Sequence, residues 1–107
     1  MIWWIRGNSK SGKSTLANKM KDVIVLDGDV LRTIWPGLGL SKEDRWEQNL
    51  RAARLAKMIH DQGYDVVVAV ICPYLELKEE IKKIIPEVKF ATLDGGKEPT
   101  NEYPFER

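Results

Sequence analysis

The feature that most constrains this chain is the segment from Gly7 to Ser14, which reads Gly-Asn-Ser-Lys-Ser-Gly-Lys-Ser. It matches the pattern G-x-x-x-x-G-K-[ST], in which glycines let the backbone fold around phosphate oxygens. The apolar run Ile2 to Ile5 precedes it and a helical pattern follows it, which is the strand and helix context that the motif requires. The sequence therefore predicts a phosphate-binding loop near the start of an α/β fold.

We expect this loop to bind the phosphates of ATP. In this interpretation Lys13 neutralises phosphate charge as a catalytic residue, and the Ser14 hydroxyl ligates Mg²⁺. The alternative is a turn that is merely rich in small residues, and the flanking strand and helix disfavour it. The predicted phosphate-binding residues are Gly7, Asn8, Ser9, Lys10, Ser11, Gly12, Lys13, Ser14 and Thr15.

Apolar runs alternate with helical patterns along the chain. Strands are predicted at 2–5, 23–26, 66–71 and 88–93, and helices at 13–21, 41–62 and 75–85. Such alternation indicates βαβ units and a parallel sheet. On the long helix, we expect Trp46, Leu50, Ala53 and Ala56 to face the sheet. A single domain is predicted over residues 1–107, with an irregular arm at about 94–107 that contains glycines and prolines without periodicity.

Two carboxylates follow the second predicted strand, in the sequence Asp27-Gly28-Asp29. Ligands of open α/β sheets bind beyond the carboxyl ends of the strands, so these side chains can face the bound phosphates. A carboxylate there can accept a proton from a substrate hydroxyl or hold magnesium through water. Asp-Gly-Asp is also common in turns and helix caps, but the phosphate loop favours a site. We assign Asp29 as a catalytic residue and as a water-mediated magnesium contact.

Basic and amide side chains form a third group. Arg32 follows the carboxylates, and Arg45 lies one turn from Gln48 or Asn49 on the long predicted helix. A bidentate arginine is suited to phosphate or sulfate. The alternative is that Arg45 and Arg51 are solvated charges in helical ion pairs, and Arg51 is expected to be the more exposed.

Composition restricts the remaining function classes. Seventeen basic and sixteen acidic residues give a net charge of +1, which argues against nucleic-acid binding through bulk charge. One cysteine, Cys72, and one histidine, His60, leave neither a disulfide framework nor a metal cluster, so we expect a cytoplasmic protein. Cys72 is interpreted as a small buried residue and His60 as a helix-end residue. The N-terminal apolar run is too short for a membrane segment or signal, and indicates a first strand.

In order and spacing, these motifs resemble the adenylylsulfate kinase family of P-loop kinases. The resemblance lies in Gly7 to Thr15, Leu26 to Arg32, Leu38 to Arg45, Gly63 and Ile71 to Tyr74. It implies a P-loop NTPase fold, a three-layer α/β/α sandwich with a four-stranded parallel sheet of order 2-3-1-4. It also implies transfer of the γ-phosphoryl of MgATP to the 3′-hydroxyl of adenosine 5′-phosphosulfate, forming 3′-phosphoadenosine 5′-phosphosulfate. Mg²⁺ is the implied cofactor, the two nucleotides are the implied partners, and a homodimer is expected.

The resemblance also assigns roles at the acceptor end. Asp29 would lie near the attacking hydroxyl, the arginines and amides would hold the phosphosulfate and ribose, and Ile71 with Pro73 would line the adenosine pocket. The predicted substrate-binding residues are Asp27, Asp29, Arg32, Leu40, Arg45, Gln48, Asn49, Ile71, Cys72 and Pro73.

The chain departs from the family pattern at several positions. Val30 stands where the family has asparagine, Leu40 where it has a phenylalanine that stacks on adenine, and Cys72 where it has serine. The family's helix asparagine falls on Gln48. Family members continue into a basic lid after the fourth strand, so a shortened, lidless member is expected, with Lys97 as a candidate replacement cation. Two alternatives stay open: a kinase for another small hydroxyl acceptor, and a nucleotide-binding module with weak or no kinase activity.

Overall fold

The apolar runs form a parallel sheet in the computed structural model, which describes residues 1–8, 10–96, 98–100 and 104–106. The strands are β1 (Ile2–Arg6), β2 (Ile24–Asp27), β3 (Val66–Ala69) and β4 (Lys89–Thr92), and the helices are α1 (Lys13–Asn18), α2 (Gly28–Ile34), α3 (Lys42–Asp61) and α4 (Leu75–Ile84). The sheet has four strands in the order β2-β3-β1-β4, all paired in parallel. The predicted α/β class, strand number and strand order are therefore confirmed.

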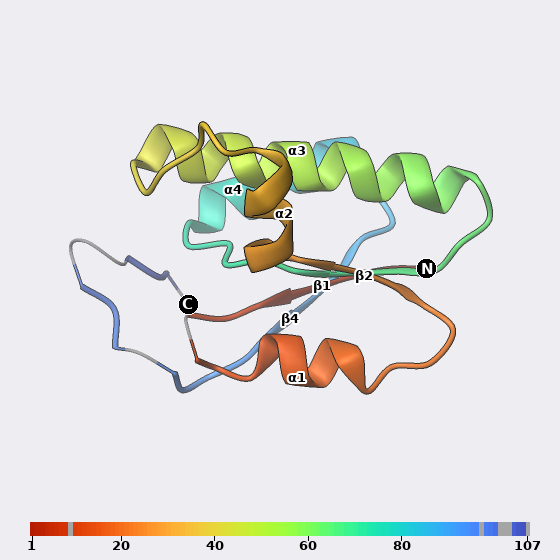
Figure 1. Ribbon diagram of the computed structural model, residues 1–107, viewed down its shortest axis with the longest axis horizontal. Helices are drawn as coiled ribbons and strands as arrows, with labels where there is room; N and C mark the ends of the chain where they lie inside the picture. The colour runs from red at the N-terminus through yellow and green to blue at the C-terminus, as the bar shows by residue number, and fades with distance from the viewer. Residues whose placement is uncertain (9, 97, 101–103, 107) are drawn as a thin grey trace.

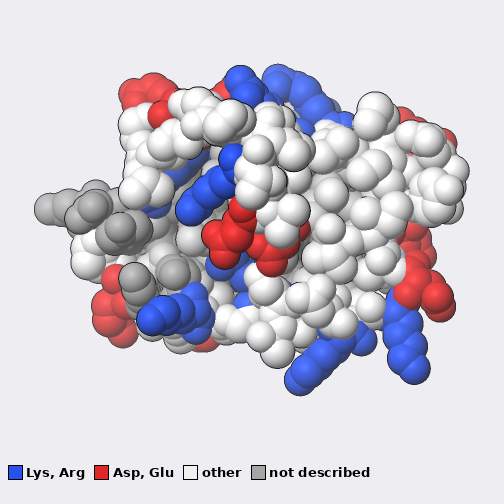
Figure 2. Space-filling view, in the orientation of Figure 1, with Lys and Arg blue, Asp and Glu red and all other residues white. Residues whose placement is uncertain are grey.

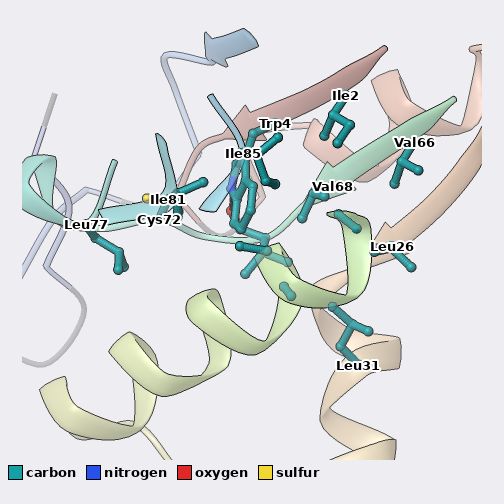
Figure 3. Close-up of a cluster of buried hydrophobic side chains, with 14 residues drawn as sticks. Ile2, Trp4, Leu26, Leu31, Val66, Val68, Cys72, Leu77, Ile81 and Ile85 are labelled. Carbon is teal, nitrogen blue, oxygen red and sulfur yellow. Dashed lines mark hydrogen bonds between the residues drawn. The ribbon is translucent and has the colours of Figure 1, made fainter. Parts of the chain in front are cut away.

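Helices cover both faces of the sheet, which gives the three expected layers (Figure 1). The side chains of β3, one of the two inner strands, and of Val70 directly after it alternate between the faces, as the period of two in a strand requires. Val66, Val68 and Val70 pack in the larger core with α3 and α4, and Figure 3 shows this cluster. Val67 and Ala69 pack in the smaller core beneath α1. This continuous burial explains why the sequence of β3 is uniformly apolar.

Helix α3 contacts the sheet through small residues. Ala52, Ala53 and Ala56 are fully buried, whereas the expected contacts Trp46 and Leu50 are only partly buried at the margin of the core. The prediction that this face of α3 packs on the sheet is therefore confirmed for Ala53 and Ala56. It was wrong for Trp46 and Leu50, which lie at the edge of the core and not at its centre. Alanine leaves room for the backbone of α3 to approach the broad valine and tryptophan side chains of the sheet.

Helix α2 was not predicted from the sequence. It has only seven residues and buries only Leu31, so it is too short for the windows in which helical periodicity is recognised. Asp27 caps it, because its Oδ1 accepts a hydrogen bond of 2.9 Å from the Asp29 backbone N–H. The first helix also ends at Asn18, earlier than the predicted boundary, and the predicted cap of α3 is present at Ser41.

The described parts of the arm after β4 contain no helix or strand, as expected. Its end returns to the sheet, where Phe105 is buried against the Arg6 guanidinium, 4.7 Å from the ring centroid. Arg6 donates to the backbone carbonyls of Cys72 and Glu106 at 2.7 and 2.6 Å. The arm therefore contacts the loop that leaves β3. Among the described residues, no helix has the length and apolar character needed to cross a membrane.

Candidate active site

A cavity of about 530 Å³ lies at the carboxyl ends of β1, β2 and β3. Acidic side chains lie between basic ones near the middle of the face shown in Figure 2. The cavity is lined by Lys10, Gly12, Lys13, Ser14, Thr15, Asp27, Gly28, Asp29, Arg32, Leu40, Arg45, Gln48, Ala69, Val70 and Ile71. The strand order places these segments together, because parallel strands end at the same edge of a sheet.

The phosphate loop depends on its two glycines. A Cβ on Gly7 would lie 2.3 Å from Ser11 Oγ, so a larger residue fits only if Ser11 moves. Gly12 has φ 93°, a left-handed conformation that side chains disfavour, and it forms the N-cap of α1. Between them, the Ser11 N–H donates to the Asn8 carbonyl at 3.1 Å and closes a tight turn. The loop therefore has the sharply folded backbone that the motif predicts.

Lys13 and Ser14 begin α1 and face Asp27, which ends β2, and Asp29, which lies in the first turn of α2. Burial is the largest influence on the Lys13 pKa and lowers it from the ordinary value, and the charges of Asp29 and Asp27 oppose this effect. The Ser14 hydroxyl donates to Asp27 Oδ2 at 2.5 Å. A cation, a hydroxyl and two carboxylates thus converge on one side of the cavity.

The two aspartates have different surroundings. Both carboxylate oxygens of Asp27 accept hydrogen bonds, one from Ser14 and one from the Asp29 N–H. The Asp29 side chain is 91% exposed and lies 3.8 Å from the Arg32 guanidinium. Asp27 is therefore the carboxylate beside the Ser14 hydroxyl, whereas Asp29 is exposed beside Arg32 and accessible to a molecule that enters the cavity.

Gln48 and Asn49, which the sequence left as alternatives, lie in different places. Gln48 lines the cavity, and its Nε2 donates to the Gly28 carbonyl at 3.3 Å. Asn49 is 1% exposed and lies outside the lining, where its Nδ2 donates to the carbonyls of Arg45 and Ile71 at 2.8 and 3.2 Å. Asn49 therefore joins α3 to the end of β3 and holds Ile71 at the cavity wall.

Arg45 is buried and lines the cavity, with its Nε donating to the Leu40 carbonyl at 2.8 Å. This contact overturns the interpretation of Arg45 as a solvated surface charge. Arg51 is the exposed arginine of the pair, 3.4 Å from Glu47 on the same helix, as expected.

Six predicted residues do not line the cavity. Gly7, Asn8 and Ser11 form the folded base of the loop, Asn49 braces α3, and Cys72 and Pro73 are buried beyond the end of β3. Burial raises the pKa of the Cys72 thiol to about 11, in line with its interpretation as a buried residue rather than a nucleophile. Ser9 and Lys97, two further predicted contacts, lie outside the described residues.

Three lining residues were not predicted from the sequence: Gly28, Ala69 and Val70. Gly28 starts α2, and a Cβ there would lie 3.6 Å from the Ala69 carbonyl oxygen, so the carboxyl ends of β2 and β3 approach closely at this point. Ala69 ends β3 and Val70 follows it within the same apolar run. Their apolar side chains predicted only that they are buried in the core. Their position at the carboxyl end of a parallel strand was the signal that could have placed them at the cavity.

The residues around Ser14 suit magnesium. Mg²⁺ prefers hard oxygen ligands and is commonly held by one or two protein oxygens together with phosphates and water. The Ser14 hydroxyl and the Asp27 carboxylate supply such oxygens side by side. Within the described part of the chain, no group of three or more His, Cys, Asp or Glu side chains is placed to hold a metal. This donor set fits an ion whose remaining ligands come from a bound nucleotide.

Comparison with known proteins matches the sequence to the family described as adenylylsulphate kinase over residues 1–94. The adenylyl-sulfate kinase of Gloeothece citriformis is 42% identical over 88 residues, which are 74% of this chain and 50% of that protein. The adenylyl-sulfate kinase of Bacillus velezensis is 38% identical over 98 residues, 83% of this chain and 50% of that protein. The chain thus spans about half the length of these relatives.

Solved structures give the same relationship. The APS kinase CysC of Mycobacterium tuberculosis, in complex with AMPPNP and APS, superposes with a TM-score of 0.75 at 32% identity, over 85% of this chain and 59% of that chain. A gluconokinase from Sinorhizobium meliloti, at 21% identity and a TM-score of 0.68, shares the fold. The matched range includes the phosphate loop, both aspartates and the basic residues of the cavity. The chain therefore belongs to the adenylylsulfate kinase family.

Proposed function

We propose that this protein transfers the γ-phosphoryl group of MgATP to the 3′-hydroxyl of adenosine 5′-phosphosulfate. The observation that carries the proposal is the convergence of Lys13, Ser14, Asp27 and Asp29 at one end of the cavity. Phosphoryl transfer needs positioning and charge stabilisation more than covalent chemistry from the protein. Family membership adds support, because this set occupies the segments that carry the family resemblance.

At the donor end, the phosphate loop binds the triphosphate. Its backbone N–H groups bind phosphate oxygens, and the Lys13 ammonium stabilises the charge of the terminal phosphates. Ser14 and Asp27 are the residues that would hold Mg²⁺, which supplies charge neutralisation to the phosphates when bound. Asp27 also accepts a hydrogen bond from the Ser14 hydroxyl and caps α2. One carboxylate therefore serves both the proposed metal site and the start of the helix.

At the acceptor end, Arg32, Arg45 and Gln48 bind the acceptor's anionic group and hydroxyls. The 3′-hydroxyl oxygen forms a bond to the γ-phosphorus, while the bond from that phosphorus to the bridging oxygen of the β-phosphate breaks and ADP leaves. Asp29 accepts the hydroxyl proton, a role that suits its exposed carboxylate at the cavity. The same charge set can therefore hold two anionic nucleotides and withdraw one proton.

The test is chromatographic measurement of 3′-phosphoadenosine 5′-phosphosulfate formed from MgATP and adenosine 5′-phosphosulfate. The parent chain should form the product, and Lys13→Ala should slow it by about 100-fold or more, because a charge that stabilises the transition state is lost. Lys21→Ala is the matched control, since Lys21 is exposed and outside the cavity lining, and it should behave as the parent. Release of ADP alone, or no reaction, from the parent would contradict the proposal.

A second candidate is a kinase for another small hydroxyl acceptor, and Leu40 is the observation that favours it. This residue is 45% exposed and lines the cavity where the family resemblance expects an aromatic ring. An aliphatic side chain gives an adenine base less stacking than an aromatic one. Comparing kcat/KM for adenosine 5′-phosphosulfate with values for nucleosides, sugars and simple alcohols separates the two candidates. Nucleotide binding without transfer to any acceptor would instead favour a binding module.

A further inference from the structure

The third position of the turn in the phosphate loop is occupied by a lysine. The Ser11 N–H donates to the Asn8 carbonyl at 3.1 Å and closes a turn in which Lys10 directly precedes the donor, which is the third position of such a turn. Lys10 has φ 64°, in the left-handed region. Turns with a positive φ at this position favour glycine or asparagine, because a side chain there costs about 1 kcal/mol of backbone strain. Local backbone preference therefore does not explain the lysine.

The location of Lys10 supplies a different explanation. Its side chain is exposed and lines the same cavity as Lys13, Asp29 and Arg32. Among the described residues, Lys10 forms no ion pair, whereas the Asp29 carboxylate is 3.8 Å from Arg32. Residues that break a local rule and occupy a cavity are those for which a functional role is expected. Lys10 thus places a positive charge in the cavity although its backbone conformation is unfavourable for a lysine.

We propose that the Lys10 side chain binds the terminal phosphate of the nucleotide donor, as a second lysine beside Lys13. This inference rests on the proposed function, because it requires that the loop bind a nucleoside triphosphate. The two lysines differ in their surroundings. Lys13 is partly buried and faces both aspartates, so part of its charge is offset within the protein. Lys10 forms no ion pair with a described carboxylate, and a triphosphate carries the additional negative charge that would bind it.

The consequence is discrimination between triphosphate and diphosphate. A lysine at the outer phosphate strengthens ATP binding more than ADP binding, because ADP lacks the group that it contacts. A hydrogen bond from an ammonium to a phosphate supports about a tenfold difference in affinity. Lys10 therefore lowers the affinity for the ADP product relative to that for the ATP donor.

The test is isothermal titration calorimetry of MgATP and MgADP with the parent chain and four variants. Lys10→Gly and Lys10→Asn remove the charge and keep residues suited to the turn. Lys10→Arg restores a cation, and Lys21→Gln removes an exposed lysine outside the cavity lining. We expect about tenfold weaker ATP binding and less than about threefold weaker ADP binding for Lys10→Gly and Lys10→Asn. Lys10→Arg and Lys21→Gln should stay within about threefold of the parent for both nucleotides.

The controls distinguish the possible failures. Relief of strain and the greater freedom of glycine in the unfolded chain oppose each other, so the melting temperature of Lys10→Gly should stay within about 4 °C of the parent. Unchanged ATP affinity in both neutral variants would overturn the role of Lys10 and leave the proposed function intact. Equal losses for ATP and ADP would overturn the assignment to the terminal phosphate. A parent chain that binds neither nucleotide would overturn this inference and the proposed function together.

Discussion

Cys72, in the loop that follows β3, makes the stability of the fold depend on pH. Its thiol is fully buried next to the Arg6 guanidinium, and burial raises its pKa from 9.0 to about 11. Arg6 opposes the shift but does not reverse it. The unfolded chain therefore releases this proton at a lower pH than the folded protein does.

The predicted consequence is a loss of stability between pH 9 and 11. In this range the folded state binds more protons at Cys72 than the unfolded state does, so the free energy of unfolding falls as pH rises, by up to about 3 kcal/mol. The lowered pKa of Lys13 has the opposite sign, because there the unfolded chain binds the extra proton. Urea unfolding of the parent and of Cys72→Ala at several pH values isolates the thiol. Equal slopes for the two proteins would contradict the assignment.

The sequence could not decide which of two neighbouring amides, Gln48 or Asn49, faces the cavity. Both amides follow Arg45 on α3, and the spacing alone allows either to face the substrate. The structure places Gln48 in the cavity lining and Asn49 in the core. The decision depends on the rotation of α3 against the sheet, and that rotation is fixed by the packing of its three buried alanines rather than by the polar residues themselves.

At the scale of elements, α2 depends on the carboxylate that also contacts Ser14. Asp27 ends β2, caps α2 through the Asp29 N–H, and accepts the Ser14 hydroxyl hydrogen bond. Helix α2 buries only Leu31, so it has few other contacts to hold it. Its position therefore follows from the cap, and the cap in turn fixes where Asp29 and Arg32 enter the cavity.

Substitution of Asp27 by asparagine should distinguish its role as the N-cap of α2 from the role of its charge beside Ser14. As an N-cap, asparagine is about as good as aspartate, so Asp27→Asn should keep the free energy of unfolding within about 0.5 kcal/mol, whereas Asp27→Ala should lose about 1 kcal/mol. Both variants lose the charge beside Ser14, so both should lower the rate of phosphoryl transfer by about 100-fold. Chemical unfolding and the product assay on each variant test this. Full activity in Asp27→Asn would show that the charge is not needed.

The elements that the sequence predicted well are those encoded locally. The glycines and lysine of the phosphate loop lie within one short segment, and the apolar runs of β1 and β3 identify buried strands without further context. Helix α2 escaped prediction because it is short and exposed, and because Gly28 opens it. A glycine directly after a strand reads as a turn, and only the cap from Asp27 reveals the helix.

In the molecule as a whole, the arm after β4 packs against β1, the first strand of the chain. The Arg6 guanidinium donates to the Glu106 carbonyl at 2.6 Å across 100 residues of sequence and lies against the Phe105 ring. The Glu106 N–H donates to the Pro73 carbonyl at 2.7 Å, and its carboxylate accepts from the Leu75 N–H at the start of α4. The sequence predicted an irregular arm but not its return, because contacts at such separation leave no local periodicity.

Phe105 is therefore expected to contribute to the stability of the entire fold. Phe105→Ala should lower the free energy of unfolding by about 3 kcal/mol, because it removes a buried ring and leaves the Arg6 guanidinium without its aromatic contact. Tyr64→Ala is the control, since Tyr64 is an exposed aromatic residue after α3 and its loss should change stability by less than about 0.5 kcal/mol. Urea unfolding measures both. Similar small losses in the two variants would mean that the arm rests on the sheet without stabilising it, whereas a large loss confined to Phe105→Ala makes the arm an integral part of the folded unit.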